Sequence, residues 1–172
     1  MRAAAGALLA CVAILPVAAA PNTFDLAKIA GVYKSRFDNA TVEGTHFRSE
    51  DVLEIVPQPQ GRAYLRVHLE FFNGHTCDAA GIADVRGDAL VYDSYKMSNG
   101  THCVLTLRAG HDRLTFADRD DICRTELCGA RGVFSEAYFD RAARRPIRYM
   151  TRLLASTEFK GAQDEYAAAH RR

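Results

Sequence analysis

The sequence lacks an excess of charge of either sign, because 22 basic residues stand against 21 acidic ones. General binding to nucleic acid needs a cationic surface, so this balance argues against nucleic acid as a partner. Low-complexity tracts are also missing. Apolar residues make up 48% of the chain and charged residues 25%, which is ordinary for a globular protein and excludes a disordered one. The 172 residues suffice to bury one core.

Several enzyme signatures are absent as well. The sequence contains no Gly-x-Ser-x-Gly nucleophile elbow, no His-Glu-x-x-His zinc motif and no Gly-Lys-Ser/Thr phosphate loop. We therefore predict a protein that is not an enzyme and has no cofactor. A hydrolase with an unrecognised site is an alternative, and it would depend on His46, His68 or His75.

Long apolar runs are missing except at the N-terminus. Residues 3–17 are almost entirely small and apolar, Arg2 precedes them, and three alanines end at Ala20 before Pro21. This pattern is typical of a secretory signal peptide, so we predict a leader at residues 1–20 and a periplasmic or secreted mature protein. A membrane anchor, or lipid attachment at Cys11, is an alternative for the same segment.

Cysteine is scarce, and four cysteines remain after the predicted leader. An even number of cysteines in an exported chain indicates disulfides, because the compartment oxidises thiols. Of the three pairings that four cysteines allow, we favour Cys77–Cys103 and Cys123–Cys128. A zinc site that adds His75 and His102 is the weaker alternative, since a thiol in a disulfide cannot bind a metal, and we predict no metal site.

The central part of the chain has the pattern of short strands and turns. Apolar and polar residues alternate from Arg62 to Phe71, which is typical of a half-buried strand. Asn73-Gly74, Gly87-Asp88 and Asn99-Gly100 predict turns. About seven or eight strands at this spacing form a meander that must hide its edges. We predict a mainly β domain at residues 21–140, a small antiparallel barrel with a sandwich as the alternative.

The segment 123–132 is the densest unusual stretch, with two cysteines, two glycines and two arginines. A loop closed by Cys123 and Cys128 would fix its arginines, and arginine binds carboxylate or phosphate groups in a bidentate way. The candidate binding residues are Arg124, Gly129, Arg131 and Gly132. Asp118, Asp120 and Asp121 just before this segment are more typical of a solvated turn than of a calcium site.

In residues 141–172 the apolar residues recur at helical rather than strand spacing and arginines are frequent, which predicts a basic helical tail. Pro146 fits the first turn of a helix, and Ile147, Met150 and Leu154 recur at helical spacing. Ser156 or Thr157 can cap a second helix that carries an apolar face. The residues of this apolar face are Phe159, Ala162 and Tyr166. The segment also predicts contact with an anionic membrane surface, through Arg144, Arg145, Arg148 and Arg152.

One resemblance bears on function. Cys77, Gly81, residues 87–90, residues 103–105, residues 114–118 and above all Cys128-Gly-Ala-Arg-Gly132 resemble uncharacterised secreted bacterial β domains. The resemblance covers residues 75–155, and some similar proteins carry lysozyme-inhibitor labels. It implies a small periplasmic barrel that binds another protein. The Ser-Gly-x-x-Tyr loop with which c-type lysozyme inhibitors enter the enzyme is missing here, so no inhibitory residue is carried over.

Together these features predict an exported envelope binding or inhibitor-like protein without catalytic activity. Its partner would be a protein or a small anionic envelope ligand, held by the segment 123–132 and the rim of the barrel. The alternative is a structural or assembly factor that makes a peripheral membrane contact through the arginine-rich helix.

Overall fold

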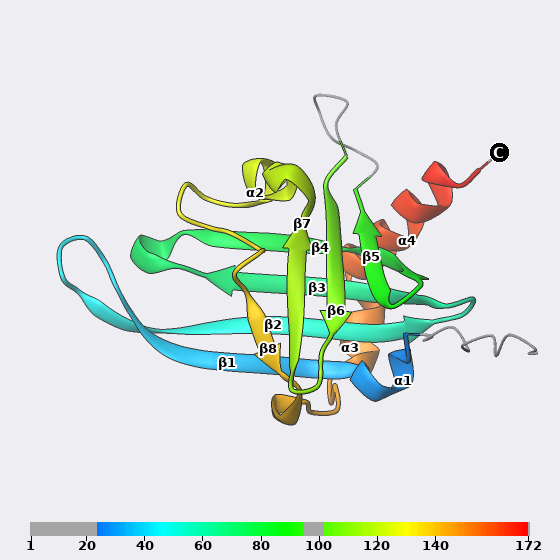
Figure 1. The fold of residues 1–172 in the computed structure, drawn as a ribbon, viewed down its shortest axis with the longest axis horizontal. Coiled ribbons are helices and arrows are strands. Elements are labelled where there is room, and N and C mark those ends of the chain that lie inside the picture. The colour runs from blue at the N-terminus through cyan, green and yellow to red at the C-terminus, as the bar shows by residue number, and fades with distance from the viewer. Residues whose placement is uncertain (1–23, 95–101, 172) are drawn as a thin grey trace, which may run out of the picture.

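The computed structural model describes residues 24–94 and 102–171. Eight antiparallel strands follow one another in a single sheet, in which each strand pairs with the next along the chain (Figure 1). The strands are β1 (Gly31–Ala40), β2 (His46–Gln58), β3 (Arg62–Glu70), β4 (Thr76–Arg86), β5 (Ala89–Asp93), β6 (Val104–Ala109), β7 (Arg113–Asp118) and β8 (Tyr138–Asp140). The helical elements are α1 (Leu26–Ile29), η1 (Phe72–Gly74), η2 (Arg119–Asp121), α2 (Ile122–Leu127), η3 (Arg141–Ala143), α3 (Met150–Ala155) and α4 (Thr157–Ala169).

The sheet curls into a nearly closed barrel. The predicted barrel is therefore confirmed, and the alternative of a β-sandwich does not apply. The last strand does not pair with the first. Instead, the backbone of Arg145 exchanges two hydrogen bonds of 2.9 Å with that of Val32, so the segment after η3 extends the edge of β1. This contact requires the glycine at position 31, because a Cβ there would lie 2.6 Å from the carbonyl oxygen of Arg145.

The barrel has two different ends. At the start of β1, the short helix α1 closes the barrel with Ile29, which is almost fully buried in the core. We call this the closed end. The β1–β2 hairpin, η1 and α2 lie at the other end, which we call the open end (Figure 1). The predicted turn at Asn73-Gly74 is found there, with positive φ at both residues, whereas Asn99-Gly100 lies outside the described residues.

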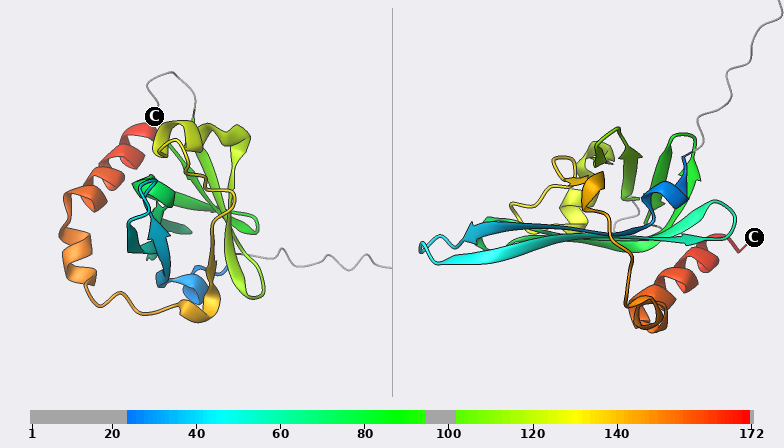
Figure 2. Two further views of the ribbon diagram at one scale, coloured as in Figure 1. Left: turned by 90° about the vertical axis from the view of Figure 1, so that its left-hand side faces the viewer. Right: turned by 90° about the horizontal axis from the view of Figure 1, so that it is seen from below.

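The alternation in β3 separates a buried inner face from a more polar outer face, which is covered only in part. Ala63, Leu65, Val67 and Leu69 point into the barrel core, as predicted. Tyr64, on the other face, is also buried, since α3 and α4 pack across the outside of β1–β4 (Figure 2). This second core consists of Val32, Val56, Tyr64, Ile82, Ile147, Leu153, Phe159 and Ala162. The predicted tail is therefore a structural layer of the fold.

Two predicted elements differ from the structure. The sequence also predicts a last strand at residues 131–134, and this is wrong, because the stretch is a loop and β8 follows it. The helix expected from Pro146 begins only at Met150, and its buried residue is Leu153 rather than Leu154, because residues 144–145 are extended beside β1. The second helix is confirmed, with Ser156 accepting a hydrogen bond from the backbone of Phe159.

Both predicted disulfide pairings are wrong: the bonds are Cys77–Cys128 and Cys103–Cys123. Cys77 and Cys103 lie at strands β4 and β6, which β5 separates. Cys123 lies in α2 and Cys128 caps its end, and side chains five apart in a helix point in directions about 140° apart. Because the meander places α2 beside the starts of β4 and β6, each cysteine of this helix instead reaches one strand.

A glycine within a strand predicts a bulge or a bend, but Gly81 lies in an unbroken register opposite Leu65. Its role is steric. A Cβ at this position would lie 2.2 Å from the ring of Tyr92 on the neighbouring strand, so only glycine leaves room for that ring.

Candidate binding cleft

The open end contains a cleft of about 360 Å³ between the inner face of β1–β3 and the segment that leads into β8. This volume falls in the range of small-ligand pockets, about 300–1,000 Å³. An eight-stranded barrel is just wide enough to fill its interior with side chains or to hold one small ligand. The cleft is lined by Ser35, Phe37, Asp51, Leu69, Phe71, Glu136, Ala137 and Tyr138.

The inner face of the barrel becomes polar toward this cleft. Along β2, the inward side chains run from the buried Ile55 and Leu53 to Asp51 and Ser49. Next to them on β1, the buried Asn39 donates hydrogen bonds of 2.9 Å to Ser49 Oγ and 3.0 Å to the carbonyl oxygen of a neighbouring phenylalanine. Polar groups inside a barrel are costly unless they are paired, so this patch marks a specialised part of the interior.

Asp51 is the most unusual group of the cleft. One carboxylate oxygen accepts a hydrogen bond of 2.8 Å from the backbone N–H of Glu70. Burial raises the pKa of the Asp51 carboxyl and the negative charge of Glu70 adds to this effect, whereas the hydrogen bond from the Glu70 backbone and the nearby His68 act in the opposite direction without cancelling it. Among the described residues no basic side chain forms an ion pair with it, and Glu136 at the rim likewise has no partner. A desolvated carboxyl in a cleft is a candidate functional group.

Aromatic side chains surround this end of the barrel, and two of them are unusually exposed. Phe72 is 41% and Tyr138 48% exposed. Each carries an arginine over its ring: the guanidinium carbon of Arg131 lies 5.4 Å from the centre of Phe72, and that of Arg113 lies 4.0 Å from the centre of Tyr138. The faces of these rings thus already attract cations of the chain itself.

The predicted binding segment 123–132 also lies at the open end, but its glycines have a packing role. A Cβ at Gly129 would lie 2.8 Å from Nδ1 of His75, and one at Gly132 would lie 2.4 Å from Sγ of Cys77. Both glycines therefore let the loop approach β4 closely, next to the disulfide. Arg131 contacts the ring described above, whereas the side chain of Arg124 is exposed and has no partner within the described residues.

The other sequence candidates have structural positions. Both carboxylate oxygens of Asp118 accept hydrogen bonds from the backbone at the start of α2, at 3.0 and 2.7 Å. His68 bonds to Asp78 on the outer face, His75 packs against the loop, and His46 is exposed at the start of β2. In the described part of the chain, no group of three or more His, Cys, Asp or Glu side chains is arranged to hold a metal ion.

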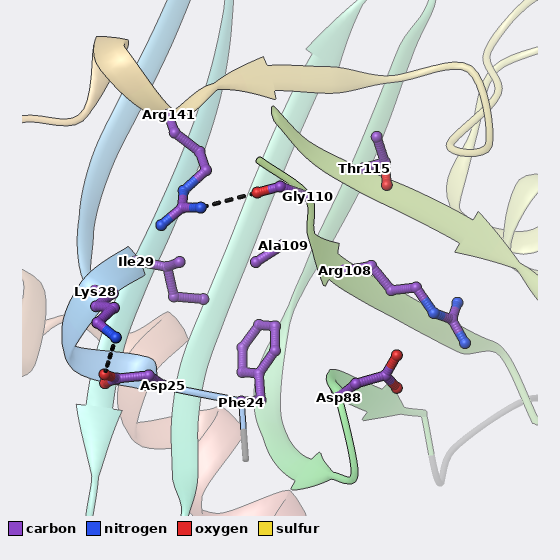
Figure 3. Close-up of a pocket in the computed structure, with 10 residues that line it drawn as sticks. All are labelled: Phe24, Asp25, Lys28, Ile29, Asp88, Arg108, Ala109, Gly110, Thr115 and Arg141. Atoms are coloured by element: carbon purple, nitrogen blue, oxygen red, sulfur yellow. Dashed lines mark hydrogen bonds and ion pairs between the residues drawn. The ribbon is translucent and has the colours of Figure 1, made fainter. Parts of the chain in front are cut away.

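The four arginines predicted to meet a membrane do not share one helix face. Arg144, Arg145 and Arg148 precede α3, and only Arg152 lies in it. Arg144 reaches back to α1 at the closed end, beside a pocket that also contains Arg141 and Lys28 (Figure 3). No helix among the described residues has both the length and the apolar character needed to cross a membrane.

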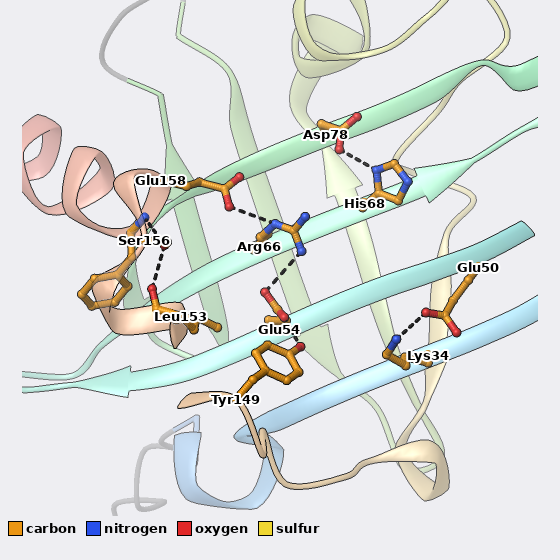
Figure 4. A network of polar contacts seen from close by, with 11 residues as sticks. Lys34, Glu50, Glu54, Arg66, His68, Asp78, Tyr149, Leu153, Ser156 and Glu158 are labelled. Atoms are coloured by element: carbon orange, nitrogen blue, oxygen red, sulfur yellow. Dashed lines mark hydrogen bonds and ion pairs between the residues drawn. The ribbon is translucent and has the colours of Figure 1, made fainter. Parts of the chain in front are cut away.

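A polar network ties the C-terminal helices to the outer face of the sheet (Figure 4). Its centre is Glu54 of β2, which is only 3% exposed. The hydroxyl of Tyr149 donates a hydrogen bond to this carboxylate, and Arg66 forms ion pairs with Glu54 at 3.4 Å and with Glu158 of α4 at 3.1 Å. A buried carboxylate is tolerable only with such partners, so the network holds the helices in one position.

This network predicts a loss of stability at high pH. Burial and the hydrogen bond to Glu54 raise the pKa of Tyr149, and burial raises the pKa of Tyr64. A raised pKa in the folded state gives stability that is complete below pH ~10, the ordinary value for tyrosine, and is lost as the pH rises toward the folded value. Tyr149→Phe should cost about 1–2 kcal/mol at pH 7 and show a smaller further loss at pH 11.

Denaturant unfolding at pH 7, 9 and 11 measures both effects. Tyr138→Phe is the control, because Tyr138 is exposed and its hydroxyl has no partner among the described residues. Equal losses at high pH in the Tyr149→Phe variant and the parent protein would contradict the assignment.

The sequence carries a signal for the position of Asp51. The apolar run 52–56 predicts a strand that starts at Val52, but β2 begins at His46. Period-two alternation extended backward from Leu53 places Asp51 and Ser49 on the inner face. Glu136 carried no such signal, because it lies in a loop whose position depends on β8.

Comparison of the chain with protein-family models, with curated proteins and with solved structures found no match. The resemblance to lysozyme-inhibitor-like β domains therefore stays a prediction. The two disulfides are typical of proteins from an oxidising compartment.

Proposed function

We propose that the protein is an exported binding protein without catalytic activity, and that the cleft at its open end takes up an organic cation. The observation that carries this proposal is the inward-facing carboxyl of Asp51, which forms no ion pair with a basic side chain in the described structure. The cation would be an ammonium or guanidinium group, either of a small amine or of a lysine or arginine side chain of a partner protein.

The lining of the cleft supports a cation rather than an anion. Among the described residues, Asp51 and Glu136 are the only charged ones that line the cleft. The rings of Phe37 and Phe71 complete the walls, and aromatic faces attract cations most strongly where water is excluded. The exposed ring of Tyr138 at the rim already has Arg113 over it. The small anionic ligand expected from Arg124 and Arg131 is disfavoured here, because Gly129 and Gly132 serve packing and Arg131 already contacts Phe72.

Two features support binding rather than catalysis. The part of the chain that the structure describes contributes no histidine, cysteine or lysine to the cleft lining, so the described lining lacks the usual pairs of nucleophile and base. Export, expected from the leader at residues 1–20, fits a barrel held by two disulfides. A periplasmic or secreted location remains part of this proposal.

Calorimetric titration of the disulfide-intact protein tests the proposal with three probes: spermidine, L-arginine amide and a c-type lysozyme as a cationic protein. We expect saturable binding of at least one probe and a loss of about tenfold or more in affinity for Asp51→Asn, because a hydrogen bond to a charged group contributes ~1.5–3 kcal/mol. Binding should also weaken as the pH falls through the raised pKa of Asp51.

Asp38→Asn is the matched control, since Asp38 is exposed and pairs with Arg48 outside the cleft. Binding of the lysozyme alone would identify a protein partner, and binding of the small amines would identify a small ligand. If all three probes failed to bind, or if both aspartate variants bound equally, the proposal would be wrong.

The Asp51→Asn variant also distinguishes an effect on binding from an effect on folding. In the free protein, Asp51→Asn removes a desolvated charge and keeps an oxygen that can accept the bond from Glu70. Because the folded pKa of Asp51 is raised, its ionisation costs stability as the pH rises. We expect Asp51→Asn to unfold at a slightly higher temperature than the parent at pH 7 and at an equal temperature near pH 3.

A further inference from the structure

The closed end holds two adjoining hollows that the proposed function does not use. The first, of about 570 Å³, has an apolar floor that includes Phe24, Ile29 and Ala109 (Figure 3). The second has a volume of about 610 Å³. Lys28 and Arg141 line both hollows, and Arg144 lines the second. The three cations come from α1, from η3 and from the segment after η3, so only the folded chain brings them together.

Both arginines are held by neutral partners. Nη1 of Arg141 donates hydrogen bonds to the carbonyl oxygens of Gly110 and His111, at 2.8 and 3.2 Å. Nη1 of Arg144 donates in the same way to Ala27 and Lys28, at 3.3 and 2.8 Å. These bonds fix each guanidinium in place, and the neutral carbonyl groups leave its positive charge uncompensated. All four bonds use Nη1, so the Nε and Nη2 donors form no hydrogen bond among the described residues.

Carboxylates also lie close to these cations. Asp112 and Asp140 line the second hollow. Asp140 pairs with Arg113 at 3.3 Å, and Asp112 lies 2.6 Å from the ring of His111, which is a cation only when it is protonated. Asp25 pairs with Lys28 at 3.3 Å, an exposed contact that contributes little. Asp88 lies at the rim together with Arg108, away from Arg141 (Figure 3). Over both hollows together, the four basic side chains are matched by four carboxylates, so the lining carries no net charge. Within it, Arg141 and Arg144 form no ion pair among the described residues, so their two guanidinium groups are the positive charges left for a ligand.

We infer that this site binds a phosphate group through Lys28, Arg141 and Arg144. Phosphate offers several charged oxygens, which suit two preoriented guanidinium groups and one ammonium group. The apolar floor beside them would accept the hydrocarbon part of a phosphate ester. The site is distinct from the open-end cleft, because the two lie at opposite ends of the barrel and share no lining residue.

The test uses the full disulfide-bonded protein with two probes. Inorganic phosphate is titrated by calorimetry, and vesicles of phosphatidylcholine with 30% phosphatidylglycerol are used in flotation at low and physiological salt. We expect binding of at least one probe, reduced about fivefold or more in Lys28→Gln and in Arg141→Gln. Lys28→Gln keeps the test informative if Arg141→Gln weakens the fold, because the Lys28 side chain is 72% exposed.

Lys160→Gln, which removes an exposed lysine from α4, is the matched control and should bind like the parent. Phosphate binding without flotation would identify a soluble phosphate ligand, and flotation that depends on Lys28 would identify a lipid headgroup. An equal loss in the Lys160→Gln variant would show general attraction between charges and overturn the site. Absence of binding to both probes would overturn it as well.

Discussion

Replacing Cys77 and Cys128 together by serine is expected to lower the free energy of unfolding by about 4 kcal/mol. These cysteines are 51 residues apart, and the entropy that a cross-link removes from the unfolded chain grows with the length of the loop it closes. The bond also attaches the loop that contains Gly132 to the start of β4. Denaturant unfolding without reductant measures the loss.

The matched variant removes Cys103 and Cys123, which are 20 residues apart, and should cost about 3 kcal/mol. A larger cost for this pair than for the first would contradict the expectation.

Peptide mapping checks the pairing itself. Trypsin places the four cysteines in separate peptides, 67–86, 97–108, 120–124 and 125–131. The described pairing joins the first peptide to the last and the two middle peptides to each other. A disulfide within 120–131, or one that joins the first two peptides, would disprove it.

The second large effect is expected in the outer core. Phe159→Ala should reduce the free energy of unfolding by about 3 kcal/mol, because removal of a buried phenylalanine loses its burial and leaves a cavity. The Phe159 ring packs edge-on against Tyr64, with the ring centres 5.1 Å apart. Calorimetric or denaturant unfolding measures the change.

Leu154→Ala serves as the control, since Leu154 is 40% exposed and its loss should stay within about 0.5 kcal/mol. Equal small effects at both positions would mean that α4 is a loosely attached tail. That outcome would favour the membrane-surface alternative, because the apolar face of α4 would then be free to meet lipid. In the described structure this face packs on the sheet instead.

The two proposed sites make the two ends of the barrel chemically different. Within the described structure, the open end has aromatic walls and a carboxyl without an ion-pair partner, and the closed end has two arginines without an ion-pair partner beside an apolar floor. Each site is tested by variants that leave the other unchanged. The protein could therefore bind a cationic group at one end while a phosphate group holds the other.

The sequence by itself determined the local elements of this protein. Period-two alternation located β3, and the glycine turns located the hairpins within the described residues, because these signals depend on neighbours along the chain. The same holds for the helix cap at Ser156 and the apolar face of α4. A meander of short strands must also hide its unpaired edge strands. These signals together sufficed to predict a mainly β barrel followed by helices.

Only the tertiary structure decided which distant residues meet. The disulfide pairing depended on the order of strands around the barrel, and the loop glycines depended on the approach of that loop to β4. The cleft around Asp51 and the cations around Lys28 combine segments far apart in the chain. The spacing of apolar and polar residues along a chain predicts which face of one helix or strand is buried. A binding site, in contrast, forms where several helices and strands come together. That convergence is set by packing, which a single sequence does not display.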